Sequence, residues 1–496
     1  CLGKWMVSEN PAGLKLPQPN LFLPTDFQLL SETGVAPNAS VPSLILEEEG
    51  LSLHYLLDSE FPIPKAAVFA LLQSGELYWS PRNVAMGILL VELLRDSLTE
   101  YVYDAEQAGF KFALDSHASG LQLTLSGFSD KLIDLLLAIL QKIRTAEFQV
   151  DRFLSLRDLV RRDSLNFFLE QPYQLAMYEY ILLVEVPRWH MRRIADEVAD
   201  IELNDVVRFS QRFFSRLHVE VLVHGNLSPE GAHLVGKSLR TVLQYQALDR
   251  SEKFVRRIVQ IPTHAQGFTL VRENTNPDNS NSAIYLSFQL GVLTLEETIS
   301  LEILAKILEK RFFQSLRTEQ QLGYVVASSA SHNMNVSSLA FVIQSAVHLP
   351  SYLDARIEEY LMSFRNELEE LAEEEFAGYV WALKAVKLEK DKFLFQKTSR
   401  LWAEVVKQRF LFDKRDLEAR ILDGDLMELR HAVVRMYEER ISSQGSSRRK
   451  VAVHMSKSRE TLDHPFHEIG DAVDFQRRQS LYTAQYYTPY LSDRLP

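Results

Sequence analysis

Residues 90–110 read LVELLRDSLTEYVYDAEQAGF, and residues 304–324, which start 214 positions later, read LAKILEKRFFQSLRTEQQLGY. Apolar residues match between the two stretches at helical spacing, and both stretches end in Gly followed by an aromatic residue. A segment with alternating apolar residues follows in each case, Leu121–Leu125 in the first and Leu339–Ile343 in the second. A pattern kept through helix and strand predicts two copies of one domain.

Each copy is predicted to begin and end with a buried strand. Residues 66–72 (AAVFALL) and 284–290 (IYLSFQL) are the opening strands, and residues 219–223 (VEVLV) and 451–453 (VAV) are the closing strands. Long helical stretches fill the intervening sequence. Strands and helices that occur in blocks are typical of α+β proteins, in which a mostly antiparallel sheet is covered by helices. We therefore predict an α+β fold with two tandem homologous domains.

The predicted domains are residues 41–250 and 263–456, separated by a charged linker. Residues 1–40 are rich in Pro, Asn and Gly and are predicted to form an extended arm, and the tail, 457–496, shows no clear periodicity. Because the chain starts at Cys1 rather than Met, we expect a fragment or one half of a processed precursor.

The composition is that of an ordinary globular protein, with 46% hydrophobic and 24% charged residues and a net charge of −12. An acidic chain lacks the basic footprint of nucleic-acid binders, so no nucleic-acid partner is expected. No apolar stretch approaches 18 residues, so no membrane span is expected. Cys1 is the only cysteine, which excludes an intramolecular disulfide and leaves the compartment open between the cytosol and a secretory organelle.

Zinc chemistry has no motif in this chain. The sequence contains 13 histidines, yet no two are four residues apart, and both HExxH and HxxEH are absent. His464 and His467 are three residues apart beside a Pro, which is typical of a polar loop. The GxSxG, GxxxxGK[ST] and GxGxxG motifs are also absent. We expect no metal or other cofactor bound by this chain.

One segment, RTEQQLGY, carries candidate site residues at both ends, Arg317 and Tyr324. Gly323 is expected to be the glycine that ends a helix, so that Tyr324 is the first residue to leave it. Seven residues make nearly two helical turns, which predicts that Arg317 and Tyr324 point into one cavity. The first copy has Tyr103 and Phe110 at these positions. The alternative is structural, because an Arg near a helix end caps carbonyl groups and Tyr is common in strands.

Six longer stretches lie in order over about residues 20–455: 23–27 (LPTDF), 93–109 (LLRDSLTEYVYDAEQAG), 170–178 (EQPYQLAMY), 215–226 (SRLHVEVLVHGN), 316–326 (LRTEQQLGYVV) and 341–345 (FVIQS). Together they resemble the C-terminal half of the insulinase-type (inverzincin) zinc metalloendopeptidases, the family of insulysin, nardilysin and pitrilysin. The resemblance implies that the two predicted copies are the third and fourth domains of that family. It also implies that they form one half of a clamshell-shaped chamber.

The resemblance further implies a function, the non-zinc half of a peptidase that cleaves peptides in an enclosed chamber. Zn²⁺ would be bound by HxxEH and a distal Glu in the missing N-terminal half, so this chain alone is expected to be inactive. Arg317 and Tyr324 would bind substrate and stabilise charge on the carbonyl oxygen, and Phe313 would line a side-chain pocket. The implied partners are the N-terminal half, as part of the same precursor or as a separate chain, and peptide substrates, and a homodimer is left open.

Two other functions remain compatible with the sequence. The chain could be a non-catalytic peptide-binding or scaffold protein that pairs extended peptides with the sheet edge of its second copy. It could also be a structural subunit in which Arg317 only caps a helix. In the peptidase, loss of the Arg317 side chain lowers turnover more than affinity. Equal losses favour the binding protein, and a loss of thermal stability alone favours the structural subunit.

Overall fold

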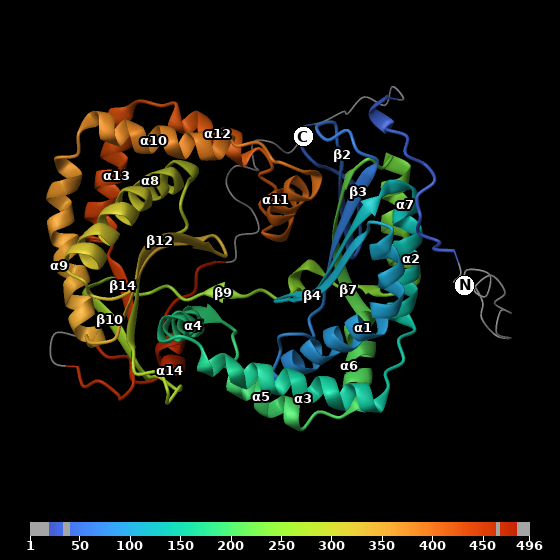
Figure 1. Cartoon of the computed structure of the whole chain (residues 1–496), viewed down its shortest axis with the longest axis horizontal. Coiled ribbons are helices and arrows are strands. Elements are labelled where there is room, and N and C mark those ends of the chain that lie inside the picture. Colours follow the sequence, from blue (N-terminus) through green and yellow to red (C-terminus); the bar gives the residue numbers. More distant parts are fainter. Residues whose placement is uncertain (1–18, 33–39, 463–466, 484–496) are drawn as a thin grey trace, which may run out of the picture.

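The computed structural model describes residues 19–32, 40–462 and 467–483 of the chain. Its strands form two large sheets, and helices pack on both faces of each sheet (Figure 1). Antiparallel pairs dominate both sheets, so the predicted α+β fold is confirmed. Most of the arm expected over residues 1–40 lies outside the described residues.

The first sheet is built from residues 43–247. Its order from edge to edge is β1 (Ser43–Glu48), β2 (Leu51–Leu57), β7 (Arg216–Gly225), β3 (Lys65–Gln73), β5 (Gly120–Phe128) and β4 (Lys111–His117), with the short β8 (Gln246–Ala247) beside β7. β2 runs parallel to β7, whereas β3 pairs antiparallel with both β7 and β5. Leu121, Leu123 and Leu125 alternate along β5 and are fully buried on one face, as predicted.

The second sheet repeats this topology. Its order is β10 (His264–Glu273), β14 (Arg449–Ser456), β11 (Ser282–Gly291), β13 (Val336–Ser345) and β12 (Val325–Asn333). Its parallel pair, β10 with β14, occupies the place of β2 with β7. Strands β2, β7, β3, β5 and β4 therefore have counterparts in the same order, and the predicted duplication is confirmed. The domain boundaries remain a prediction.

Six helices of the first copy form a core with one face of the first sheet. They are α1 (Pro81–Gln107), α2 (Ser129–Arg144), α3 (Val150–Asn166), α5 (Met191–Ala199), α6 (Leu203–Ser215) and α7 (Pro229–Leu243). α1 begins after Ser80, whose hydroxyl accepts a hydrogen bond from the amide of Asn83. Leu90, Leu94 and Leu98 follow at four-residue spacing and are buried, which explains the helical pattern in the sequence.

The second copy has a matching core on the equivalent face of its sheet. Its helices are α8 (Leu295–Phe312), α9 (Pro350–Glu369), α10 (Glu373–Leu388), α12 (Lys414–Leu422) and α13 (Leu426–Arg440). α8 begins with a capping box, in which Thr294 and Glu297 satisfy each other's backbone amides. This arrangement fixes the start of the helix that leads to Arg317.

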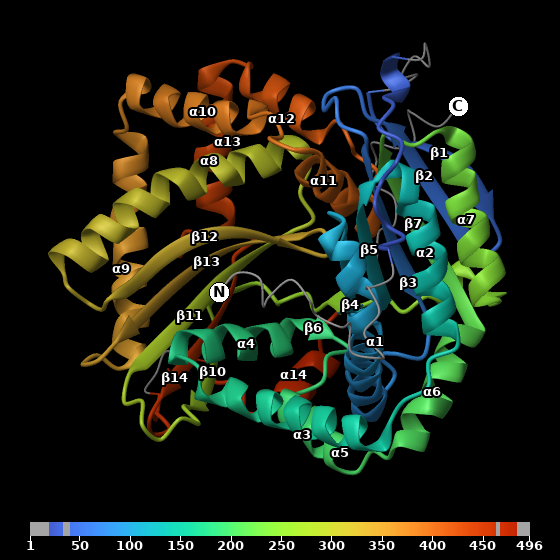
Figure 2. The ribbon, with the colours of Figure 1, turned by 45° about the vertical axis from the view of Figure 1, so that its right-hand side comes forward.

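The remaining face of each sheet is covered by a helix from the other copy. α4 (Pro172–Val184) comes from the first copy but packs on β11 and β14, and α11 (Leu394–Val406) comes from the second copy but packs on β3 and β7 (Figures 1 and 2). Under α11, Trp402 meets Phe69 edge to face, with 5.9 Å between ring centroids, and its Nε1 donates to Gln122 Oε1 at 2.9 Å. The two copies are therefore interlocked.

A buried ionic cluster fixes α11 on the first sheet. Asp58 Oδ1 lies 3.3 Å from His224 Nε2 and 3.1 Å from Lys397 Nζ, and His224 Nδ1 lies 2.8 Å from Thr398 Oγ1. Burial opposes ionisation of Asp58, but hydrogen bonds from His224, the amide of Phe61 and Lys397 hold its pKa at about 2. The carboxylate therefore stays charged inside the interface and ties the two copies together.

The segment between the copies and the tail add smaller elements. β6 (Glu185–Val186) follows α4 and pairs with β9 (Arg257–Ile258) in the connecting segment. In the tail, α14 (Ala472–Arg477) packs against α4, and Gln476 donates to two of its backbone carbonyl groups. Within the described ranges, no helix is long and apolar enough to cross a membrane.

Candidate functional site

The helix that carries Arg317 ends earlier than predicted. α8 continues into a π-helical segment, η5 (Phe313–Glu319), and the chain turns at Gln321, which has φ +54°. Gly323 does not adopt a positive φ, so the prediction of a helix-ending glycine there is wrong. A glycine is required at position 323 for a different reason, because a Cβ there would lie 2.0 Å from the backbone oxygen of Gln344. The sequence shows a glycine after a helix but not the β13 strand that approaches it.

Arg317 lies in an open hollow with a volume of about 560 Å³. The lining consists of Phe313, Arg317, Thr318, Gln321 and Gly323, and it includes no carboxylate. Phe313 is 47% exposed and contributes an apolar surface. The structure thus brings two of the three predicted site residues, Phe313 and Arg317, to one hollow.

The guanidinium of Arg317 forms no hydrogen bond or ion pair with any residue that the structure describes. By contrast, Arg311 on the same helix is paired with both Glu367 and Glu375. Among the described residues, Arg317 therefore makes no contact that would support the interpretation that it caps helix carbonyl groups. Its five N–H donors are free to bind an oxygen-rich ligand.

Tyr324 is not part of the lining of the hollow. Because the chain leaves the helix before Tyr324, the argument that seven residues return to one helix face is wrong. The side chain is 56% exposed, and its hydroxyl accepts a 2.7 Å hydrogen bond from Gln344 Nε2. The same hydroxyl donates to Gln171 Oε1 over 3.5 Å, which is long for a hydrogen bond.

Two glutamines that the sequence analysis missed hold Tyr324. Gln344 on β13 is completely buried and also donates to Gln171 Oε1 at 3.0 Å, while its own Oε1 accepts from the amide of Tyr173 at 3.1 Å. Asn279 donates to Gln171 Oε1 as well. Both glutamines lie within the quoted stretches EQPYQLAMY and FVIQS. The signal in the sequence was a glutamine, Gln344, at a strand position expected to be buried within one of the stretches that carry the resemblance.

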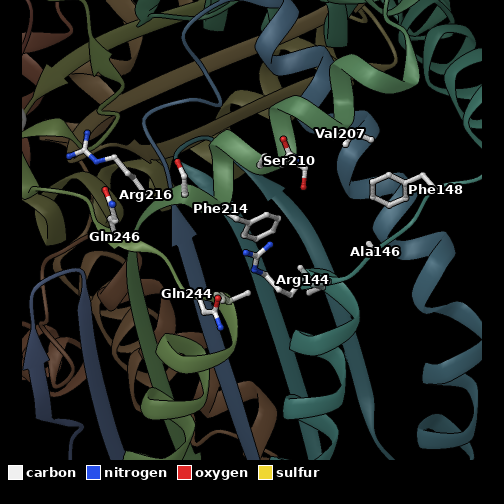
Figure 3. Close-up of a pocket in the computed structure, with 13 residues that line it drawn as sticks. Arg144, Ala146, Phe148, Val207, Ser210, Phe214, Arg216, Gln244 and Gln246 are labelled. Carbon is white, nitrogen blue, oxygen red and sulfur yellow. The ribbon is translucent and has the colours of Figure 1, made fainter.

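A second hollow of about 480 Å³ lies in the first copy, where α2, α6 and α7 end (Figure 3). Arg144, Ser210, Phe214 and Gln244 are among its lining residues. Three helix C-termini converge there, and their carbonyl groups carry negative partial charge that Arg144 complements. No predicted site residue lies in this hollow, so the Arg317 hollow is the better candidate site.

Comparisons with known proteins place the chain in a family. A model described as the middle or third domain of peptidase M16 matches residues 1–197, and one described as PQQ synthase PqqF-like, C-terminal lobe domain 4, matches residues 303–402. Insulin-degrading enzyme from Bos taurus is 32% identical over 457 residues, which cover 91% of this chain and 44% of that protein. The chain belongs to the M16 peptidase family.

Solved structures support the same fold for this M16 chain. Pitrilysin superimposes with a TM-score of 0.82 at 20% identity over 95% of the chain and 49% of pitrilysin. A peptidase M16 inactive domain from Pseudomonas fluorescens matches over its whole length with a TM-score of 0.62 at 12% identity, covering 85% of this chain. The chain spans about half the length of the curated relatives it matches, and it corresponds to the C-terminal half of an insulinase-type protease.

No cluster of three or more His, Cys, Asp or Glu that could hold a metal ion occurs in the part of the M16 chain that the structure describes. His467 contacts the ring of His264, with 4.2 Å between ring centroids, and His464 lies outside the described residues.

Proposed function

We propose that this chain is the non-zinc half of a metalloendopeptidase, which binds peptides and supplies transition-state donors to a zinc site on a separate N-terminal half. The observation that carries the proposal is the Arg317 guanidinium, which has no partner among the described residues and lies beside the exposed ring of Phe313. An unpaired Arg next to an apolar surface suits a peptide, which offers a carbonyl oxygen and a side chain together.

Arg317 donates to the substrate carbonyl oxygen or to its neighbour as negative charge develops there. Tyr324 contributes a phenol whose orientation is fixed by the 2.7 Å bond from Gln344. Its own proton is held only by the 3.5 Å contact with Gln171, so it can turn to a substrate oxygen at small cost. Phe313 contacts the side chain next to the bond that is cleaved.

The N-terminal half, encoded in the same precursor or as a separate chain, would bind Zn²⁺, and a homodimer of the assembled enzyme is left open. When bound, the metal ion activates water as the nucleophile. The residues of this chain bind the peptide, orient its carbonyl group and neutralise its charge. Peptides short enough to enter the proposed clamshell chamber would be the substrates.

The test combines this chain with an N-terminal half that carries HxxEH and follows cleavage of a quenched fluorescent peptide. Arg317→Ala is expected to lower kcat by about 10²–10³, with a smaller change in peptide affinity, because one charge-stabilising donor is lost. Arg435→Ala, on the exposed side of α13, is the matched control. Equal losses in kcat and affinity support a peptide-binding protein instead, and a loss confined to thermal stability supports the structural subunit.

A further inference from the structure

A pocket of about 340 Å³ lies where the two sheets meet the linker between the copies. It is formed by equivalent hairpin turns of the two sheets, β4–β5 at residues 117–119 and β12–β13 at residues 333–335, together with linker residues 253–256 and the end of α11. The ends of β4, β12 and α11 all face the middle of the molecule (Figure 1). Both copies are needed to build this pocket.

The pocket is lined by cations and contains no carboxylate. Lys253, Arg256 and Lys407 line it together with His117 and His332. Its apolar lining includes Phe254, Val255, Met334 and Val406. A pocket with this lining suits a ligand that carries both a negative charge and an apolar group.

Carboxylates outside the lining neutralise only part of this charge. Glu185 accepts from both Arg188 and Arg256, so Arg256 shares its counter-ion. Glu220 pairs with Lys253 and with His218. Arg256 keeps a buried Nε without a hydrogen-bond partner, although nine-tenths of its side chain is buried.

Lys407 has no ion pair with any described residue. Glu404, whose charge acts on Lys407, is paired with Arg409. Burial together with the charge of Arg409 lowers the pKa of Lys407, and burial together with Lys414, Arg409 and Lys407 lowers the pKa of His332 to about 4. The local potential at the mouth of the pocket is therefore positive.

The pocket is joined to the Arg317 hollow by the edge strand of the second sheet. β12 starts at Val325, directly after Tyr324, and ends at Asn333 in the pocket wall. Eight steps of about 3.3 Å separate the two ends by about 26 Å. An extended peptide that passes Tyr324 would therefore reach the pocket about eight residues further along.

We propose that this pocket binds the C-terminal residue of a peptide substrate, with its carboxylate on Lys407 and Arg256 and its side chain against Phe254 and Met334. The assignment rests on the proposed function and adds a substrate class, peptides with a free carboxyl end about eight residues from the bond that is cleaved. Phosphate offers similar oxygen acceptors, so the experiment separates the two ligands.

The test measures fluorescence anisotropy of two labelled ten-residue peptides with an apolar last residue, one ending in a free acid and one in an amide, binding to the 496-residue chain. The acid is expected to bind about tenfold more tightly than the amide, a difference typical of one charge-assisted bond. Lys407→Ala should abolish this preference. Lys237→Ala, on the exposed side of α7, should keep it.

Equal binding of acid and amide, or a preference that survives in Lys407→Ala, overturns the proposal. If inorganic phosphate competes for the pocket while the acid and the amide bind equally well, the pocket binds a free oxyanion. This result also overturns the proposal. Arg317→Ala should leave the preference for the acid unchanged, because the hollow and the pocket lie at opposite ends of β12. A failed Arg317 experiment in the assembled enzyme is thus distinguishable from a failure of this proposal.

Discussion

Gln344→Met is expected to lower turnover of the assembled peptidase about tenfold while the chain remains folded. Gln344 donates to Tyr324 at 2.7 Å and to Gln171 at 3.0 Å, and it accepts from the amide of Tyr173 at 3.1 Å. Methionine has a similar length and volume but no polar group, so all three bonds are lost without a large cavity. Tyr324 then keeps only its 3.5 Å contact with Gln171.

The size of the effect follows from these bonds. Each neutral hydrogen bond contributes about 0.5–1.5 kcal/mol, so the loss of three lowers the free energy of unfolding by about 2–4 kcal/mol. A chain with a large core tolerates such a change. If the misaligned phenol of Tyr324 costs about 1.4 kcal/mol in the transition state, kcat falls about tenfold.

The assay compares Gln344→Met, Tyr324→Phe and the double variant in the assembled enzyme, with turnover expressed per folded protein. Since Gln344 is expected to act through the hydroxyl of Tyr324, the double variant should lose no more than Tyr324→Phe alone. The matched control is Gln289→Met, because Gln289 is also a buried strand glutamine that binds backbone groups, those of Val259 and Ile261. Additive losses, or an equal fall in kcat for the control, would refute the positioning role.

Three further outcomes concern the interlock and the turn before Tyr324. Trp402→Ala should lower the free energy of unfolding by about 3–5 kcal/mol in urea titrations, and a loss below about 1 kcal/mol would contradict the packing of α11 on the first sheet. Gly323→Ala should cost about 1–3 kcal/mol and reduce turnover, because its Cβ would meet the Gln344 backbone; unchanged turnover and stability would show that the strand yields. The pKa of Asp58 is lowered from 3.8 to about 2, so its carboxylate stabilises the fold above about pH 4 and loses this effect as the pH falls toward 2. That contribution is about 2–3 kcal/mol, and Asp58→Asn should show a flatter fall in stability over this range, whereas a slope equal to that of the unmodified chain would exclude the carboxylate.

The sequence predicts what local patterns encode. Alternation at Leu121–Leu125 and helical spacing at Leu90–Leu98 gave the right elements, and their recurrence gave the duplication. The end of the helix after Arg317 was predicted wrongly, because a glycine that serves close approach to a neighbouring strand looks the same in sequence as one that ends a helix. The π-helical turn has no pattern that distinguishes it from an α-helix.

The exchanged helices and the support of Tyr324 depend on contacts between residues far apart in the chain. α11 is amphipathic and α4 is apolar around most of its surface, but neither pattern tells which sheet the helix will cover. Gln171 and Gln344 are 173 positions apart, and nothing in either stretch shows that the two side chains meet. Their meaning appears only when Tyr324 is placed between them.

The exchange of α4 and α11 also determines when, during translation, the second face of the first sheet can be covered. The long strands of the first sheet are complete once Gly225 has been made, but the helix that shields their second face ends at Val406. At about 5–20 residues per second, a ribosome needs about 10–40 s to add the residues in between. During that time an apolar face with Phe69 and Leu222 is bare. A chaperone can therefore bind this apolar face of the nascent chain until α11 of the second copy has been synthesised and covers it.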